Sequence, residues 1–207
     1  GGSYPTIVAC LSALWARERT GKGQFVDVAM TDCVMPLLAA TFGEALNTSA
    51  IPKRGELFLS GGLAHYNVYK CKDEKWIALG GLEPKFFQGF CAMVNKPEWM
   101  NKMLPIPELV VELKKELQDL FLTKTRDEWI ANAENHDICL SPILDIDEVE
   151  KDKHLSERDM FIEMEHADYG KFKSVNQPFK FSETPAKPSW SAPLMGEDND
   201  LLNEVIS

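Results

Sequence analysis

One glutamate, Glu83, stands where an apolar strand pattern gives way to a helical one. Residues 79–84 read Leu-Gly-Gly-Leu-Glu-Pro, and proline favours the first position of a helix. A carboxylate at such a junction projects beyond the end of the strand, where it can remove a proton from a bound ligand. Spacing alone also allows a plainer role, in which the carboxylate caps the helix that follows. Glu83 is therefore the first candidate for a catalytic base.

Glycines offer a second kind of site, because a backbone without side chains can approach a ligand closely. Gly61 and Gly62 form such a pair, although the same pair is also compatible with a flexible loop. Residues 21–23 (Gly-Lys-Gly) lack the spacing of a phosphate-binding loop, and they end a helical pattern instead of opening one. We interpret residues 21–23 as a tight turn and keep Gly61 and Gly62 as candidates for contact with a cofactor.

The spacing of the histidines and carboxylates does not indicate a metal site. The four histidines show no ligand spacing with one another, and none adjoins a recognisable nucleophile motif. Asp145, Asp147 and Glu148 resemble a carboxylate cluster, but the glycine and the terminal glutamate of a calcium loop are missing. We therefore expect no metal site, and we expect these carboxylates to cap a helix and face water.

The five cysteines are odd in number and include no Cys-x-x-Cys pair, which argues against a disulfide framework and a structural zinc site. Cys10, Cys33 and Cys91 fall on the apolar faces of predicted helices, so we expect them to be buried. Free thiols indicate a reducing compartment. We expect the cytoplasm, or an organelle such as the mitochondrion or peroxisome in a eukaryote.

Composition and charge exclude several classes of protein. The chain has 207 residues, of which 44% are hydrophobic and 26% charged, and this is enough for one or two soluble domains. Its net charge of −10 and the lack of a dense basic cluster argue against nucleic-acid binding. No apolar run approaches 18 residues, so we expect no membrane span.

The order of elements expected over residues 3–45, which is helix, tight turn, strand and helix, is typical of an α/β layer. Ser3 is the expected N-cap of a helix whose apolar residues recur every three to four positions and which stops at Gly21. A short strand is expected over 24–28 and a second helix over 30–45. One strand does not make a sheet, so its partners must come from elsewhere. Residues 47–64 are polar and interrupted by proline and glycine, which indicates a linker or binding loop.

The rest of the chain has the pattern of a small α+β unit followed by extended segments. We predict a hairpin over 65–79 and helices that start at 84, 107 and 125, the last with a Thr-x-x-Glu capping box. A second hairpin is predicted over 160–175. The proline-rich residues 184–196 are expected to be extended, with a last short helix from 198 or 199.

Several motifs together resemble the class III CoA-transferase family, also called CaiB/BaiF. Residues 19–30 (Arg-Thr-Gly-Lys-Gly-Gln-Phe-Val-Asp-Val-Ala-Met) resemble one hallmark of that family. Residues 60–69, from Ser-Gly-Gly to Tyr-Asn-Val-Tyr, and residues 76–87 resemble two more, and the second of these contains Glu83. The tail over 184–197 is similar to the family's closing segment, although Asp198 stands where many relatives have histidine. The resemblance spans the whole chain, yet family members are nearly twice as long.

The resemblance implies an α/β fold that is only part of an enzyme. Residues 1–46 would be the end of a large Rossmann-like domain, and 47–64 a linker with the glycine-rich loop. Residues 65–150 would form a small α+β domain, and 151–207 an extended C-terminal segment that returns to the large domain. The family's N-terminal half, with most coenzyme A contacts and the catalytic aspartate, would precede residue 1.

The same resemblance implies chemistry on an acyl–coenzyme A thioester, with coenzyme A as part of the substrate and no metal. The family's transferases use the upstream aspartate as a nucleophile, and Gly61 and Gly62 correspond to their glycine-rich loop. The family's 2-methylacyl-CoA racemases move the C2 proton with an upstream Asp/His and a glutamate that corresponds to Glu83. Glu83 favours racemisation, and CoA transfer between carboxylic acids remains open.

Some expectations concern what surrounds Glu83. We expect a neighbouring domain to shield it from water, and the 207-residue chain alone to be inactive. Relatives form interlocked homodimers, so the same is expected here. The alternative is a non-catalytic subunit that completes a site on a second chain. The acyl pocket is expected to be lined by the apolar and aromatic residues around the glycine pair: Leu57, Phe58, Leu63, His65 and Tyr66.

Overall fold

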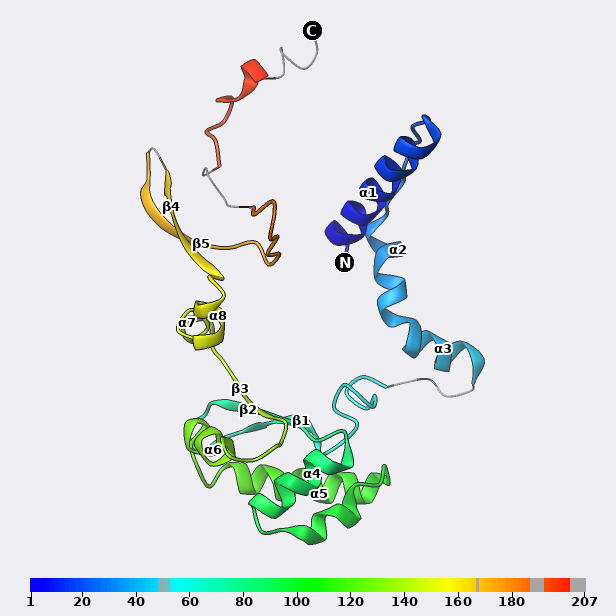
Figure 1. Ribbon diagram of the computed structural model, residues 1–207. Helices are drawn as coiled ribbons and strands as arrows, with labels where there is room; N and C mark the ends of the chain where they lie inside the picture. Colours follow the sequence, from blue (N-terminus) through cyan, green and yellow to red (C-terminus); the bar gives the residue numbers. More distant parts are fainter. Residues whose placement is uncertain (49–50, 52, 167, 187–191, 202–207) are drawn as a thin grey trace.

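The chain follows an open ring in the computed structural model, which describes residues 1–48, 51, 53–166, 168–186 and 192–201 (Figure 1). Helices α1 to α3 form one side of the ring, and a body made of a sheet and helices forms its base. The β4–β5 hairpin lies on the other side, and the described residues form no core that joins this hairpin to α1.

The first helix, α1 (Ser3–Thr20), ends as expected. Gly21 adopts φ 69°, and its N–H donates to the carbonyl of Arg17 at 2.8 Å. The expected cap at Ser3 is wrong, because Gly2 is the N-cap and no side chain caps the helix. The apolar stripe is present but uncovered, since none of the described residues among 1–60 is buried. Its side chains are 48–66% exposed: Tyr4, Ile7, Val8, Leu11, Leu14 and Trp15.

Two further expectations for this region are wrong, for the same reason. Residues 24–28 form no strand, and Phe25 is 93% exposed, because the described residues offer these residues no ladder partner. Cys10 is exposed and Cys33 only half-buried, because no described residue packs over the faces of the helices that carry them. Cys91, which lies in the body of the ring, is buried as expected.

The helix expected over 30–45 is helical but interrupted. It consists of α2 (Met30–Val34), the 3₁₀ turn η1 (Met35–Leu38) and α3 (Ala39–Asn47). Pro36 lies in the 3₁₀ turn, and a proline has no N–H to donate to the carbonyl four residues earlier. Pro36 therefore accounts for the interruption of the helix, and the spacing of apolar residues gives no sign of it.

The base of the ring contains a three-stranded antiparallel sheet in the order β1-β2-β3. The predicted hairpin is confirmed as β1 (Tyr66–Lys70) and β2 (Trp76–Gly80), with Tyr66 opposite Gly80. The third strand, β3 (Leu140–Ile143), was not predicted and pairs with the other side of β2. The strand that leads to Glu83 is therefore the central one.

Helices α4 (Pro84–Met93), α5 (Pro107–Phe121) and α6 (Arg126–Ala133), with the 3₁₀ helix η2 (Pro97–Lys102), pack on one face of this sheet. The capping box of α6 is confirmed. The core is apolar and includes four aromatic side chains that contact one another through Phe121. Its most buried members are all 0% exposed: Cys71, Ile77, Phe87, Phe90, Leu113, Leu117 and Phe121.

None of the described helices covers the opposite face of the sheet. Side chains alternate along a strand, so Val68 and Trp76 point away from the helices and are 47% and 44% exposed. Ile143, opposite Trp76 on the next strand, is 39% exposed. This apolar sheet face is on the side of the body nearer the centre of the ring (Figure 1).

Residues 144–175 lead away from the body through the short helices α7 (Ile146–Val149) and α8 (Lys153–Glu157). The second predicted hairpin is confirmed as β4 (Phe161–His166) and β5 (Gly170–Val175). Part of the tail expected to be extended, 187–191, lies outside the described residues, and so does most of the expected last helix, 202–207. Among the described residues, no helix is long and apolar enough to cross a bilayer.

Candidate functional site

The Gly61-Gly62 pair belongs to a tightly closed loop. Gly61 has φ 98°, a conformation that favours glycine, and the N–H of Gly62 donates to the carbonyl of Leu57 at 2.8 Å. A Cβ at Gly62 would lie only 2.5 Å from the carbonyl oxygen of Glu56 and 2.6 Å from that of Leu57. The pair is therefore a packed turn in which a side chain has no room.

Gly61 forms part of the wall of two cavities. One, of about 390 Å³, lies between the glycine loop and strands β1 and β2, and its lining includes Tyr66, Asn67 and Gly80. The other, of about 620 Å³, lies between the glycine loop and the start of α5, and its lining includes Phe58, Gly62 and Leu63. Of the residues predicted for an acyl pocket, these cavities contain Phe58, Leu63 and Tyr66, and neither is lined by Leu57 or His65.

His65 lies in the core beside the glycine loop. Its side chain is 4% exposed, and its ring centroid lies 5.3 Å from that of Phe87 on α4. Burial lowers the pKa of the imidazole, so it is neutral near pH 7. Its backbone carbonyl accepts a hydrogen bond of 2.8 Å from the N–H of Gly81. His65 therefore joins the glycine loop to the segment that carries Glu83.

Glu83 occupies the N-cap position of α4, with φ −78° and ψ 133°. Its side chain makes no capping hydrogen bond, and it is exposed, with no ion pair to any other described residue. The backbone before it is closely packed, because a Cβ at Gly81 would lie 3.0 Å from the carbonyl oxygen of His65. The carboxylate thus projects from a fixed backbone, and the described residues do not supply the shielding that a catalytic base needs.

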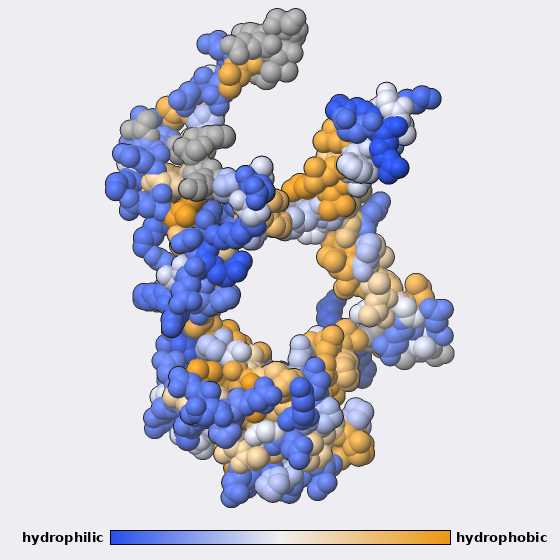
Figure 2. Space-filling model, in the orientation of Figure 1, coloured by the Kyte–Doolittle hydropathy of each residue, from blue (hydrophilic) through white to orange (hydrophobic). Residues whose placement is uncertain are grey.

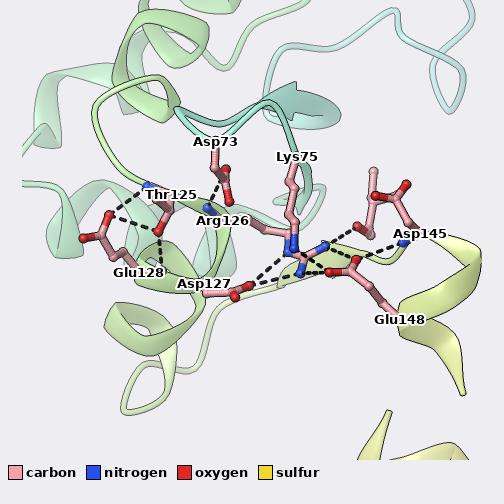
Figure 3. Close-up of polar contacts among 9 residues, drawn as sticks. Asp73, Lys75, Thr125, Arg126, Asp127, Glu128, Asp145 and Glu148 are labelled. Carbon is pink, nitrogen blue, oxygen red and sulfur yellow. Dashed lines mark hydrogen bonds and ion pairs between the residues drawn. The ribbon is translucent and has the colours of Figure 1, made fainter. Parts of the chain in front are cut away.

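A second polar cluster, which the sequence did not single out, is centred on Arg126 (Figure 3). The guanidinium donates to both carboxylate oxygens of Glu148, at 2.6 and 2.9 Å, and to the carbonyl of Ile143 at 2.9 Å. Glu148 also accepts from the ammonium of Lys75 at 2.5 Å. The backbone N–H of Arg126 donates to Asp73 at 3.1 Å. These contacts join the β1–β2 turn, α6, the end of β3 and α7.

Strongly shifted pKa values often mark catalytic groups, but this cluster has a structural explanation. Hydrogen bonds from Arg126 and then Lys75 hold the pKa of Glu148 far below its usual range, and Glu148 raises the pKa of both cations. The Arg126 side chain is only 5% exposed, and its charge is neutralised by the carboxylate of Glu148. Asp145 and Glu148 form the expected helix cap, but Glu148 faces Arg126 as well as water.

No group of three histidine, cysteine or carboxylate side chains within the described ranges is placed to hold a metal ion. The candidate site is therefore made of Glu83, the glycine pair and the cavity walls around them.

Comparison with protein families decides the classification. Residues 1–199 match the family model described as CoA-transferase family III. The chain belongs to this family. The resemblance in the motifs over 19–30, 60–69 and 76–87 is thereby confirmed.

Family III relatives with curated names include two kinds of enzyme. The chain is 29% identical to the human alpha-methylacyl-CoA racemase, over 99% of this chain and 53% of the relative. It is also 29% identical to the formyl-CoA:oxalate CoA-transferase of Bradyrhizobium sp. (strain ORS 278), over 100% of this chain and 54% of the relative. The chain thus spans about half the length of the curated relatives it matches.

A solved family III structure supports the fold. The CaiB/BaiF family protein from Brucella suis superposes with a TM-score of 0.72 at 21% identity, covering 100% of this chain and 54% of that one. The ring of Figure 1 is therefore a mixed α/β arrangement that corresponds to part of such a structure. At this identity the match concerns the fold alone.

Proposed function

We propose that this chain contributes Glu83 and the Gly61-Gly62 loop to an enzyme that moves the C2 proton of a 2-methylacyl–coenzyme A. The observation that carries the proposal is the position of Glu83. It lies at the start of α4, beyond the central strand, with its carboxylate unused by any cap or ion pair among the described residues. A carboxylate that caps a helix accepts a hydrogen bond from an N–H of the first turn, and the Glu83 side chain accepts none.

The chemistry needs one base on each side of the carbon. One base removes the C2 proton, and the electron pair of the broken C–H bond shifts into an enolate whose negative charge lies on the thioester oxygen. A second group returns a proton to the opposite face, which inverts the centre. Glu83 serves as one member of this acid/base system, paired with an Asp/His from the half of the enzyme outside this chain. A positioned base of this kind gives about 10²- to 10⁴-fold acceleration.

The glycine loop serves the thioester end of the substrate. A turn without side chains lets the backbone approach the ligand, and the loop wall at Gly61 borders both cavities. Phe58, Leu63 and Tyr66 supply apolar surface for the acyl group. No cation of this chain is assigned to the phosphates of coenzyme A, which we place on the other half of the enzyme.

Uncovered apolar surface supports a role for that other half. Figure 2 shows apolar surface along α1 to α3 and on the side of the body that faces the central hole of the ring. Trp15 is 66% exposed and Leu37 73%, values too high for the core helices of a large domain. We propose that the remaining half of the enzyme covers these helices and shields Glu83. A second copy threaded through the ring would give an interlocked homodimer in a reducing compartment such as the cytoplasm.

The test is exchange of the C2 proton in deuterated water, followed by NMR with a 2-methylacyl-CoA and the natural protein that contains this chain. Glu83→Gln is expected to slow exchange at least about 100-fold. Glu108→Gln is the matched control, because Glu108 also lies at a proline-led helix start, in the first turn of α5. Undiminished exchange in Glu83→Gln, with exchange present in the wild type, would refute the role of Glu83.

CoA transfer is the second candidate, favoured by the similarity to the formyl-CoA:oxalate CoA-transferase. In that reaction an upstream aspartate attacks the thioester, and Glu83 removes no proton. Transfer of coenzyme A to a carboxylic acid at the wild-type rate in Glu83→Gln would favour this reading. A non-catalytic subunit is the remaining alternative. It would show as a chain that binds a Rossmann-like partner while Glu83→Gln leaves every activity of the complex unchanged.

A further inference from the structure

The side chain of Lys114 on α5 contacts the glycine loop directly. Its ammonium donates to the backbone carbonyl of Gly61 at 2.5 Å, a contact between residues 53 positions apart. The neighbouring residues Leu113 and Leu117 are 0% exposed in the core, so the helix that carries the lysine is fixed. The contact therefore connects a rigid helix to the turn that borders both cavities.

The peptide unit between Gly61 and Gly62 is held at both of its polar groups. Lys114 binds its carbonyl, and the carbonyl of Leu57 accepts its N–H at 2.8 Å. Two hydrogen bonds in opposite directions fix the orientation of the peptide plane. Without them, a glycine pair has more conformational freedom than any other dipeptide, and ligand binding would have to order it.

The charge of Lys114 is not neutralised by a carboxylate of the described chain. Lys102, another half-buried lysine of the body, is paired: its ammonium lies 2.9 Å from Glu112 and 2.7 Å from Glu116. Among the described ranges, no acidic side chain lies within ion-pair distance of Lys114. Its positive charge consequently acts on the loop itself, beside a cavity wall, in a protein whose net charge is −10.

We propose that Lys114 is a positioning residue, which presets the Gly61-Gly62 peptide for contact with the acyl-CoA thioester. The effect on catalysis rests on the proposed function, whereas the effect on the loop does not. Lys114 itself need not touch the substrate. Charge-assisted hydrogen bonds typically change an equilibrium by about ten- to hundredfold, which sets the size of the expected effects.

The experiment compares Lys114→Met with Lys115→Met in the natural protein that contains this chain. Lys115 is the next residue of α5, is exposed and makes no contact with the loop, so it controls for loss of a positive charge on the helix. Hydrogen–deuterium exchange of the segment 55–63 is measured by mass spectrometry without substrate. Lys114→Met is expected to speed that exchange about tenfold, whereas Lys115→Met leaves it unchanged.

Kinetics on the same variants separate positioning from simple stability. Lys114→Met is expected to lower kcat/KM about ten- to hundredfold at an unchanged melting temperature, and Lys114→Arg to recover most of it, since a guanidinium can still donate to the carbonyl. Unchanged loop exchange in Lys114→Met would overturn the proposal at any activity. A loosened loop with an unchanged kcat/KM would overturn it as well. A wild type without acyl-CoA activity would instead refute the proposed function. The hydrogen–deuterium exchange result would still show whether Lys114 holds the glycine loop.

Discussion

Phe121 lies at the centre of the aromatic contacts in the body of the ring. Its side chain is 0% exposed, and its ring lies 5.2 Å from Tyr69, 5.7 Å from Phe90 and 5.3 Å from Trp129. Its backbone carbonyl also accepts the indole N–H of Trp129 at 3.0 Å. Strand β1 and helices α4, α5 and α6 therefore meet at one side chain, and α4 is the helix that begins after Glu83.

Replacing Phe121 with alanine removes this contact and leaves a cavity. Truncation of a buried phenylalanine costs about 3–5 kcal/mol, and loss of aromatic pair geometry contributes to that figure. Domains of ordinary stability have a free energy of unfolding of about 5–15 kcal/mol, so Phe121→Ala should remove about a fifth of it or more. Because α4 loses its anchor, activity that depends on Glu83 should fall at temperatures where the variant begins to unfold.

Urea unfolding monitored by tryptophan fluorescence tests this reasoning, since Trp129 lies against the altered side chain. Phe172→Ala is the control, because Phe172 is 39% exposed on the β4–β5 hairpin and should cost less than about 1 kcal/mol. A loss below about 1 kcal/mol for Phe121→Ala, or equal losses for both variants, would show that the aromatic contacts do not hold the body together.

Two further predictions concern titratable groups. The lowered pKa of Glu148 means that its bond to Arg126 stabilises the fold above the unfolded-state value of about 4.3 and that this stabilisation is lost as the pH falls below it. The melting temperature should therefore be higher for wild type than for Glu148→Gln at pH 7, and the difference should narrow as the pH falls below about 4.3 without vanishing at pH 3; a constant difference would contradict this linkage. Burial raises the pKa of Cys71 and Cys91 to about 11, so iodoacetamide at pH 8 should label exposed Cys139 and reach those two only after unfolding. Mass spectrometry of the labelled peptides checks this, and equal labelling of all three would refute it.

The sequence predicted elements well where local chemistry determines them. The capping box at Thr125, the glycine stop at Gly21 and both hairpins follow from residues close in the chain, and all appear in the structure. The strand expected over 24–28 failed because strand formation depends on a partner, which local pattern does not provide. The same reason explains why strand β3 was missed, since its short run of Leu-Ser-Pro-Ile gains its conformation from pairing with β2.

The candidate site shows the same division. Glu83 and the glycine pair stood out by type and local context, and the structure places both near the end of β2 through the Gly81–His65 hydrogen bond. Arg126 and Lys114 were missed because their partners lie 22 and 53 residues away, at Glu148 and Gly61. An isolated basic residue on a predicted helix carries no signal for such a contact. A buried guanidinium becomes recognisable only once its accepting groups are known.

The position of β3 also bears on how the protein is made. During synthesis, β1 and β2 can form their hairpin early, because only a short turn separates them. The second edge of β2 must then wait for residues 140–143, which follow three α-helices and one 3₁₀ helix later in the chain. Until those residues emerge from the ribosome, the strand Trp76–Gly80 presents unpaired N–H and carbonyl groups beside apolar side chains, a template for pairing with another nascent chain. Contacts between distant residues also form slowly, so the interval of exposure is long on the scale of folding. We expect mutations in residues 140–143 to reduce the yield of folded protein more than they reduce the stability of the molecules that do fold.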